Sequence, residues 1–384
     1  MQQRALHACI ELLQLTVTHL QTSVISNLSI PSRVHDVQAL LSAASTNQHT
    51  CLDGVAESKS ETIVDDHFKI SLVNISNQLN NALAMAAKLP AAEKPGNSSS
   101  SSLKYVYPVS EDGHPTWMTD EDRQNIVSEN NECDLVVAKD GSGNFTTINE
   151  ALNAAPNERS TRFVIYIKAG AYFENVVVTS KKKNIMLVGD GYDKTWIKGN
   201  RNAVDGWPTY QSAVLAVEGE GFIAKNMAIE NYAGPTKFQA VALRTTADRA
   251  AFFRCRIAGY QDTLFVHSLR QFFRECEIYG TIDFIFGNSA VVFQKCSLYA
   301  RRPLSYQYIV FTAQGRTSRD QTTGISIMES KMEAASDMVP DKNLFKSWYT
   351  YNHASKRGNR YTTYYDALYF INYDGRIHHA CKTW

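Results

Sequence analysis

The chain has 384 residues, of which 44% are hydrophobic, so it is long enough for two domains with buried cores. Its 39 basic and 38 acidic residues leave a formal net charge of +1, which gives no reason to expect a nucleic-acid partner. No apolar run approaches the length of about 18 residues that a membrane span needs, so none is predicted.

Residues 1–88 have the pattern of an incomplete helical bundle. Three stretches place apolar residues three or four positions apart, which indicates helix faces. They are Leu6, Ile10, Leu13, Val17, Leu20 and Val24; then Val37, Leu41 and Ala44, ending near Asp53-Gly54; then Phe68, Leu72, Ile75, Leu79, Ala82 and Ala86, with Asp65 and Asp66 at the N-cap. Because three helices are a four-helix bundle without one member, we expect their apolar stripes to be incompletely covered.

The first stretch does not have the uniform apolar centre of a signal peptide, because His7, Cys9 and Glu11 interrupt it. Four N-x-S/T sequons nevertheless favour the secretory route, at Asn27, Asn74, Asn97 and Asn144. Residues 89–133 are predicted to be a linker, because residues 89–103 contain two prolines, a glycine and a serine run at 98–102. We expect this segment to stay irregular until about Cys133.

From Asp134 onward the chain consists of short runs rich in Val, Ile and Phe, separated by Gly, Asn and Asp. Examples are Phe163–Ile167, Val176–Val178, Ile185–Val188 and Val291–Phe293. No long helical pattern alternates with them, which argues against a βαβ fold.

An internal repeat of about 20 residues indicates a β-solenoid. Four positions keep one register through three successive turns of the chain. They are Phe252, Phe273 and Phe293; Cys255, Cys276 and Cys296; Ile257, Ile278 and Leu298; and Gly259, Gly280 and Ala300. In a parallel β-helix such positions stack about 4.8 Å apart.

The repeat makes Asp262 and Asp283 equivalent, because each lies three residues after its glycine, Gly259 or Gly280. Two carboxylates side by side repel, which raises one pKa and leaves a proton shared between them. Such a pair supplies one nucleophile and one neutral acid, which ester cleavage can use. From the repeat alone, both aspartates could equally occupy solvated turns, or an arginine could hold one of them for structure.

Four motifs resemble the plant pectin methylesterases (pectinesterases), in the family's order, between residues 134 and 346. They are Gly170-Ala-Tyr-Phe-Glu174, Gln239-Ala-Val-Ala-Leu243, Gly259-Tyr-Gln-Asp-Thr-Leu264 and Asp283-Phe-Ile-Phe-Gly-Asn288. Residues 1–88, with Ala5-Leu-His-Ala-Cys9 and Thr50-Cys-Leu-Asp-Gly54, resemble the later part of a pectinesterase-inhibitor domain whose opening part is missing. The resemblance implies a right-handed parallel β-helix preceded by a partial α-helical bundle.

The resemblance also implies residue roles in hydrolysis of pectin methyl esters. Asp283 is expected to be the nucleophile and Asp262 the acid that protonates departing methanol, then the base that activates water. Gln239 and Gln261 are expected to stabilise the oxyanion with their amides. Phe265 and Phe286 are expected to line the sugar groove. No metal or cofactor is implied.

The seven cysteines leave at least one unpaired within a monomer. In the stacked column, Cys276 could reach either Cys255 or Cys296. The resemblance selects a Cys276–Cys296 disulfide, and in the helical region a Cys9–Cys51 disulfide. It further implies pectin as substrate, a proteinaceous pectinesterase inhibitor as partner, and a secreted, cell-wall location.

The chain departs from the family pattern at three places. The family's Leu-Gly-Arg-Pro-Trp motif is replaced after Lys346 by Ser347-Trp348-Tyr349, and residues 347–384 match nothing familiar. A threonine usual in the groove is Val214, and the basic processing site is reduced to Asp122-Arg123-Gln124-Asn125. The missing arginine favours a weak or silent pectin-binding β-helix, whereas the intact aspartates and glutamines favour an active esterase. A galacturonan hydrolase or lyase fits the motifs less well.

Overall fold

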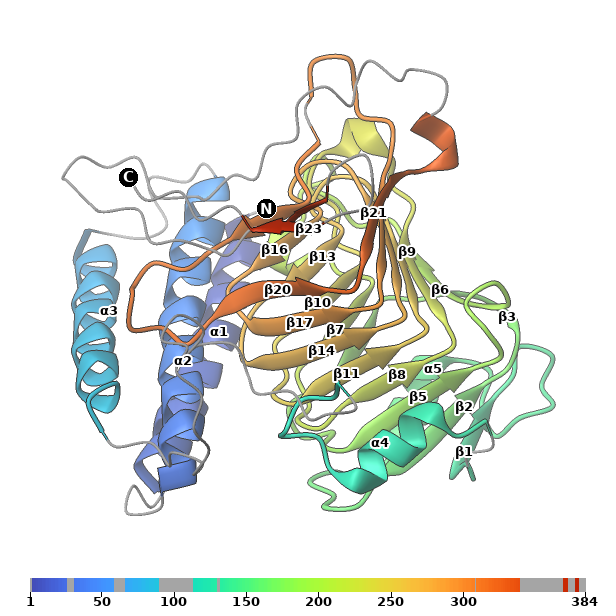
Figure 1. The fold of residues 1–384 in the computed structure, drawn as a ribbon, viewed down its shortest axis with the longest axis horizontal. Helices are drawn as coiled ribbons and strands as arrows, with labels where there is room; N and C mark the ends of the chain where they lie inside the picture. Colours follow the sequence, from blue (N-terminus) through green and yellow to red (C-terminus); the bar gives the residue numbers. More distant parts are fainter. Residues whose placement is uncertain are drawn as a thin grey trace.

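The computed structural model describes residues 2–25, 31–58, 66–89, 113–129, 132–307, 309–338, 369–371 and 377–379. In Figure 1 a bundle of three helices stands beside a stack of parallel strands. The bundle consists of α1 (Gln2–Ile25), α2 (Pro31–Glu57) and α3 (Asp66–Ala86). Two shorter helices, α4 (Asp120–Val127) and α5 (Ile148–Ala154), lie outside it. Among the described helices, none is both long and apolar enough to cross a membrane.

The strands form three parallel sheets, because each coil of the chain contributes about one strand to each sheet. The eight-stranded sheet runs β1 (Leu135–Val137), β2 (Phe163–Ile167), β5 (Ile185–Gly189), β8 (Ile223–Lys225), β11 (Ala250–Phe253), β14 (Arg270–Arg274), β17 (Ala290–Gln294) and β20 (Gly324–Met328). The seven-stranded sheet runs β3 (Gly170–Phe173), β6 (Thr195–Gly199), β9 (Ala228–Asn231), β12 (Arg256–Ala258), β15 (Glu277–Gly280), β18 (Ser297–Ala300) and β21 (Lys331–Ala334).

The six-stranded sheet runs β4 (Val176–Val178), β7 (Leu215–Val217), β10 (Leu243–Thr245), β13 (Leu264–Val266), β16 (Ile285–Gly287) and β19 (Thr312–Gln314). The chain therefore forms a parallel β-helix, as the repeat predicts. Beyond it, β22 (Tyr369–Ile371) and β23 (Ile377–His379) pair antiparallel. Short 3-10 turns occur at Thr209–Gln211 (η1), Pro235–Lys237 (η2) and Ser336–Met338 (η3).

The predicted columns are present in the strand register. Phe273 pairs with Phe252 on one side and with Phe293 on the other, and the ring centres are 4.6 and 4.8 Å apart. Ile278 likewise pairs with Ile257 and Leu298 in the seven-stranded sheet. These side chains are fully buried in the interior of the β-helix. Stacking of like apolar side chains thus forms the core that the repeat spacing predicts.

The disulfide predicted in the helical region is confirmed, because Cys9 of α1 is bonded to Cys51 of α2. The disulfide predicted between Cys276 and Cys296 is not formed in this structure, where both are buried free thiols. Each thiol instead donates to a carbonyl oxygen of the preceding coil: Cys276 to Phe252 at 3.4 Å and Cys296 to Phe273 at 3.5 Å. The two thiols also lie within hydrogen-bond reach of each other, and burial raises the pKa of both well above the usual range.

The first helix is present, but it buries a different face from the one its apolar stripe suggests. Leu6, Ile10, Val17 and Val24 are 40%, 47%, 54% and 83% exposed. The buried side consists mainly of small and polar residues, namely Ala5, Ala8, Cys9, Leu12, Thr16, His19 and Ser23. Small residues allow close approach to α2 and to the β-helix, and the apolar stripe is left uncovered, as expected of an incomplete bundle.

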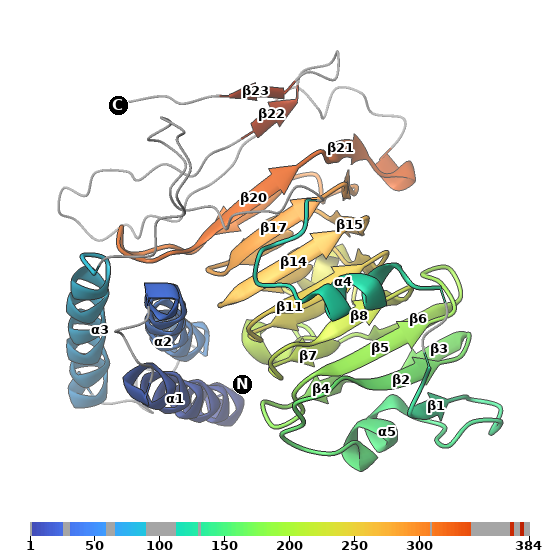
Figure 2. The ribbon, with the colours of Figure 1, turned by 60° about the horizontal axis from the view of Figure 1, so that its bottom comes forward.

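The end of the predicted linker is ordered rather than irregular. Thr119 caps α4, accepting a hydrogen bond from the Asp122 backbone N–H at 3.0 Å, and three acidic residues occupy the first turn. Both features stabilise a helix N-terminus. Met118 and Ile126 pack on the outer face of the eight-stranded sheet, over which α4 lies in Figure 2. Residues 90–112 of the predicted linker lie outside the described residues.

Candidate active site

Asp262 and Asp283 lie at the ends of the turns that lead into β13 and β16, two neighbouring strands of the six-stranded sheet. Leu264 of β13 pairs with Ile285 of β16. The backbone N–H of Asp262 donates to the carbonyl oxygen of Ile282 in the next coil at 3.0 Å. The two aspartates therefore occupy equivalent positions in adjacent coils, as the repeat predicts.

The backbone at both aspartates is left-handed, with φ of 61° at Asp262 and 47° at Asp283. This region is unfavourable for most side chains but is tolerated by Asp, whose short polar group can bond locally. Asp262 is 8% exposed and Asp283 is half-buried, so the two carboxyl groups have different environments.

The environment of Asp262 disfavours its charged form. Burial, and then the negative charges of Asp283 and Glu57, raise the pKa of Asp262 well above its usual range. Desolvation and a nearby like charge both disfavour a carboxylate. The arrangement therefore favours a neutral Asp262 beside the carboxyl group of Asp283, and acid-assisted nucleophilic attack needs a neutral acid next to a second carboxyl group.

Two stacked aromatic rings, of Phe265 and Phe286, each follow an aspartate by three residues. The rings of Phe265 and Phe286 are 4.2 Å apart between centres and are inclined by only 15°. They belong to a column of register partners across the outer face of the six-stranded sheet: Val177, Ala216, Arg244, Phe265, Phe286 and Ala313. The column forms the floor on which the predicted sugar groove would lie.

The two glutamines lie in the turns of successive coils. The carbonyl oxygen of Gln239 accepts from the N–H of Ala203 at 2.9 Å, and that of Gln261 accepts from Ala240 at 3.2 Å. These bonds hold the backbone next to Asp262. The side-chain Oε1 of Gln261 is buried without a hydrogen-bond partner among the described residues. The amide role predicted for both side chains stays a prediction.

The helical bundle packs on this same face. Ala8 and Leu12 of α1 and Leu72 of α3 share one apolar cluster with Tyr210 and Phe265, and Phe286 packs against it. Polar contacts also join α2 to this face of the β-helix. The side chain of Asn288 donates to Thr46 Oγ1 at 2.8 Å, and Thr50 Oγ1 lies 2.9 Å from Nε2 of His267. The bundle thus lies directly over the predicted groove.

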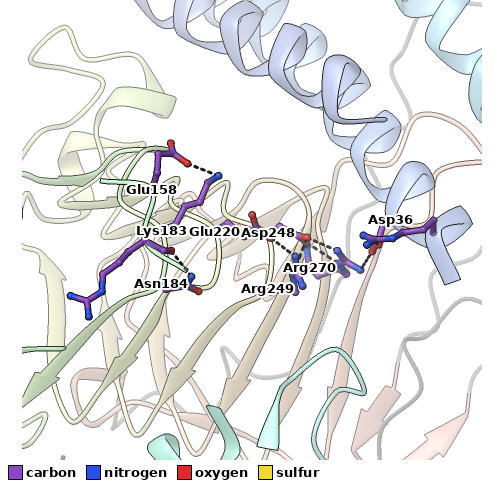
Figure 3. Close-up of polar contacts among 10 residues, drawn as sticks. Asp36, Glu158, Lys183, Asn184, Glu220, Asp248, Arg249 and Arg270 are labelled. Atoms are coloured by element: carbon purple, nitrogen blue, oxygen red, sulfur yellow. Dashed lines mark hydrogen bonds and ion pairs between the residues drawn. The ribbon is translucent and has the colours of Figure 1, made fainter. Parts of the chain in front are cut away.

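Charged groups connect α2 to the turns of the β-helix. Figure 3 shows Arg270 between Asp248 and Asp36, which lies on α2. Nη1 of Arg270 is 2.6 Å from Oδ1 of Asp36. Burial acts to raise the pKa of Asp248, but Arg270 and then Arg249 outweigh it and hold that pKa below its usual value. The same view shows Lys183 with Glu158, and Glu220 beside Arg249. Arg270 therefore joins the bundle to the β-helix through one buried cation.

Sequence reasoning did not identify Glu57, His267 or Arg244 as part of this face. Glu57 accepts from the Thr209 hydroxyl at 3.1 Å and its charge reaches Asp262. No sequence signal indicates that helix and sheet meet there. For Arg244 a signal did exist, because it precedes Phe265 by one repeat and so belongs to the same column.

Comparison with known proteins agrees with this geometry. The family model described as pectinesterase matches residues 134–352, which is more than half of the chain. A second model, described as plant invertase/pectin methylesterase inhibitor, matches residues 1–85. The chain therefore belongs to the pectinesterase family, with an inhibitor-type helical region before the β-helix.

Several named proteins are similar. "Probable pectinesterase/pectinesterase inhibitor 39" of Arabidopsis thaliana is 46% identical over 353 residues, covering 90% of this chain and 64% of that protein. "Pectinesterase 1" of Citrus sinensis is 44% identical over 351 residues, covering 90% and 60%. A solved pectin methylesterase from carrot superposes with a TM-score of 0.58 at 50% identity, covering 59% of this chain and 71% of that one. The chain thus spans about three fifths of the length of these curated relatives.

Proposed function

We propose that this protein hydrolyses the methyl esters of pectin, releasing methanol and leaving free galacturonate carboxylates. The observation that carries the proposal is the aspartate pair on adjacent coils. Asp262, buried with a raised pKa, supplies a proton, and Asp283, half-buried beside it, supplies a carboxylate. The sequence motifs and the family membership support the same chemistry.

In the first step, a carboxylate oxygen of Asp283 attacks the carbonyl carbon of the methyl ester. The carbonyl π electrons move to its oxygen, and the amide N–H groups of Gln239 and Gln261 stabilise the resulting oxyanion. Collapse of this intermediate breaks the bond to the methoxy oxygen, which takes the proton of Asp262 and leaves as methanol. The galacturonyl group is now joined to Asp283 as an anhydride.

In the second step, Asp262, now a carboxylate, removes a proton from water as the water oxygen attacks the galacturonyl carbon. Collapse breaks the bond to Asp283, which leaves as a carboxylate. Asp262 keeps the proton, so both aspartates return to their starting states. The raised pKa of Asp262 suits both directions of transfer, because a group poised nearer neutral pH can give and accept a proton.

The stacked pair of Phe265 and Phe286 would hold the sugar chain against the column floor, since apolar ring faces supply contact area at low entropy cost. The helical bundle packs on those rings in this structure. Substrate therefore reaches the aspartates only when the bundle moves from the face. A separate pectinesterase inhibitor would compete for the same surface. On the family resemblance we also propose secretion to the cell wall.

The test of this proposal is the identity of the product. Purified protein is incubated with highly methyl-esterified pectin, and methanol, reducing ends and unsaturated ends are measured together. The proposal predicts methanol without new reducing or unsaturated ends. Reducing ends would indicate a hydrolase and unsaturated ends a lyase, and either result without methanol would overturn the proposal.

A second function, pectin binding with weak or no hydrolysis, is favoured by one specific observation. The family's Leu-Gly-Arg-Pro-Trp motif is absent after Lys346, where Ser347, Trp348 and Tyr349 lie outside the described residues. An arginine there would orient the nucleophile, and loss of orientation lowers the rate by orders of magnitude. Restoring the motif with a family-like C-terminus should then raise methanol release strongly. Equal rates before and after restoration would exclude this alternative.

A further inference from the structure

Arg301 directly follows β18 and reaches back to a turn two coils earlier in the β-helix. That turn, residues 259–263, contains Asp262 and joins β12 of the seven-stranded sheet to β13 of the six-stranded sheet. Nη1 of Arg301 donates to the carbonyl oxygen of Gly259 at 3.1 Å, and Nη2 donates to the hydroxyl oxygen of Tyr260 at 2.7 Å. One guanidinium group therefore holds the first two residues of the turn.

Backbone hydrogen bonds also fix this turn, but only to the coils directly beside it. The carbonyl oxygen of Gln261 accepts from the N–H of Ala240 at 3.2 Å, and that of Tyr260 accepts from the N–H of Thr281 at 2.9 Å. Bonds between adjacent coils recur throughout the parallel sheets of this fold. The two bonds from Arg301 instead skip the intervening coil, so they add a restraint that the sheet ladders do not supply.

The guanidinium group of Arg301 is itself held in place by further contacts. Its carbon Cζ lies 3.8 Å from the ring centre of Tyr260, and its Nε donates to Oδ2 of Asp337 at 2.9 Å. Asp337 belongs to η3, which follows β21 at the C-terminal end of the β-helix. A planar group with several donors and a flat face can make all of these contacts at once, which a lysine cannot. Arg301 is therefore a rigid link between η3 and the turn.

The position of the Asp262 carboxyl group depends on the backbone of this turn. The φ of 61° at Asp262 is left-handed, a conformation that persists only where the surrounding structure determines it. The Oε1 atom of the neighbouring Gln261 is buried without a hydrogen-bond partner among the described residues, so this atom does not anchor the turn. A displacement of about 1 Å at a reacting group can lower a rate about a hundredfold. A group that fixes this backbone therefore affects both side chains.

The charges that shift the pKa of Asp262 do not include that of Arg301. After burial, they are the negative charges of Asp283 and Glu57, and both raise that pKa. A cation acting directly on Asp262 would lower it. The ion pair of Arg301 is with Asp337. Arg301 therefore acts on Asp262 through the geometry of the turn, which distinguishes it from an arginine that stabilises a carboxylate by its charge.

We propose that Arg301 is a positioning residue, which holds the turn at residues 259–263 so that Asp262 and Gln261 are directed at the ester. Asp337 fixes Arg301 in turn, so the C-terminal end of the β-helix supports the proton donor three coils away. The inference rests on the proposed function for the reaction that the turn serves. The positioning itself can be measured without catalysis, because it fixes the environment of the Asp262 carboxyl group.

The first measurement is NMR titration of the Asp262 carboxyl group in the full chain labelled with isotopic aspartate, its signal assigned by its loss in Asp262→Asn. In Arg301→Gln the pKa of Asp262 should fall toward its usual value, because a released carboxyl group gains water and moves away from Asp283. Arg301→Lys keeps the charge but not the planar donors, so it should lower the pKa too. Asp337→Asn leaves the turn itself intact and should give a smaller shift of the same sign.

Each other outcome of the titration contradicts the proposal. A rise in the pKa of Asp262 in Arg301→Gln would mean that Arg301 acts through its charge. An unchanged pKa would mean that Arg301 is only structural. Arg302→Gln is the matched control, since it removes an exposed arginine at the next position, and it should leave the pKa of Asp262 as it is in the wild type.

The second measurement is methanol release from methyl-esterified pectin by the same variants. Arg301→Gln should lower kcat about tenfold or more with little change in KM, because the turn acts on the proton donor rather than on sugar binding. Arg302→Gln should match the wild type. An unchanged kcat in Arg301→Gln would overturn the proposal. Methanol release by the wild type with an unshifted pKa in Arg301→Gln would reject the positioning role alone, whereas the predicted pKa shift without any methanol release would reject only the esterase.

Discussion

The hydroxyl oxygen of Thr50 on α2 lies 2.9 Å from Nε2 of His267, and the ring of His267 stands edge-on to Phe265, 5.0 Å away. The bundle thus reaches the aromatic pair proposed to hold substrate. If the aromatic pair and the aspartates form the proposed substrate site, the helices must separate from the β-helix before substrate can bind there.

Asp36→Lys should loosen the bundle. The change places a second cation beside Arg270, where the structure has an ion pair at 2.6 Å, and this repulsion should weaken docking by about 2 kcal/mol. Hydrogen exchange of the α1 and α2 amides should become faster, and methanol release should increase. Asp193→Lys, beside Arg256 on the seven-stranded sheet, is the control and should change neither. Unchanged exchange in Asp36→Lys would show that this ion pair does not hold the bundle.

Asp262→Asn should stabilise the fold at neutral pH. The folded pKa of Asp262 is raised, so the folded state binds more protons than the unfolded state between the unfolded value of about 3.9 and the folded value. Stability of the wild type therefore falls as pH rises through that window, and the amide variant avoids the fall. Urea denaturation from pH 4 to pH 8 measures it. A variant less stable than the wild type at pH 7 would contradict the assigned cause.

Asp248→Asn should have the opposite effect. The folded pKa of Asp248 is lowered, so its contribution is present above about pH 3.9 and is lost as pH falls through the folded value. Breaking its buried pair with Arg270 should destabilise the protein by about 3 kcal/mol at pH 7. In denaturation at acid pH, the difference in free energy of unfolding between the wild type and Asp248→Asn should become smaller. Glu220→Gln, at an exposed pair with Arg249, should cost well under 1 kcal/mol.

Phe273→Ala should test the stacked core. Phe273 is fully buried between Phe252 and Phe293, so truncation leaves a cavity and should destabilise by about 3–5 kcal/mol. Phe173→Ala, at a ring 63% exposed, should change stability by less than about 1 kcal/mol. Similar losses in both variants would mean that the column is not the main core.

The β-helix could be predicted because its repeat is local in the chain. Phe252, Phe273 and Phe293 recur at nearly constant spacing, and a constant spacing in a parallel stack means one column. The same register predicts that Asp262 lies next to Asp283. Pairing of strands thus followed from sequence alone.

The helical region was less predictable because its partner is remote in sequence. The spacing of Leu6, Ile10 and Val17 correctly indicated a helix, but it could not show that Ala8 and Leu12 would be buried instead. Which face of α1 is buried depends on its disulfide to α2 and on its packing against the β-helix, about 200 residues away along the chain. Sequence periodicity carries no information about either. The short helix α4 was missed because its packing against the eight-stranded sheet is also non-local.

The most direct measurement of the central proposal is methanol release from methyl-esterified pectin by wild type, Asp283→Asn and Asp262→Asn. An amide at either position keeps the shape, but it removes the nucleophile or the proton donor. We predict methanol release by the wild type and a loss of about a thousandfold or more in each variant. Asp140→Asn, in an exposed turn, should behave as the wild type. If Asp283→Asn releases methanol within about tenfold of the wild type, Asp283 is not the nucleophile and the proposed mechanism is wrong.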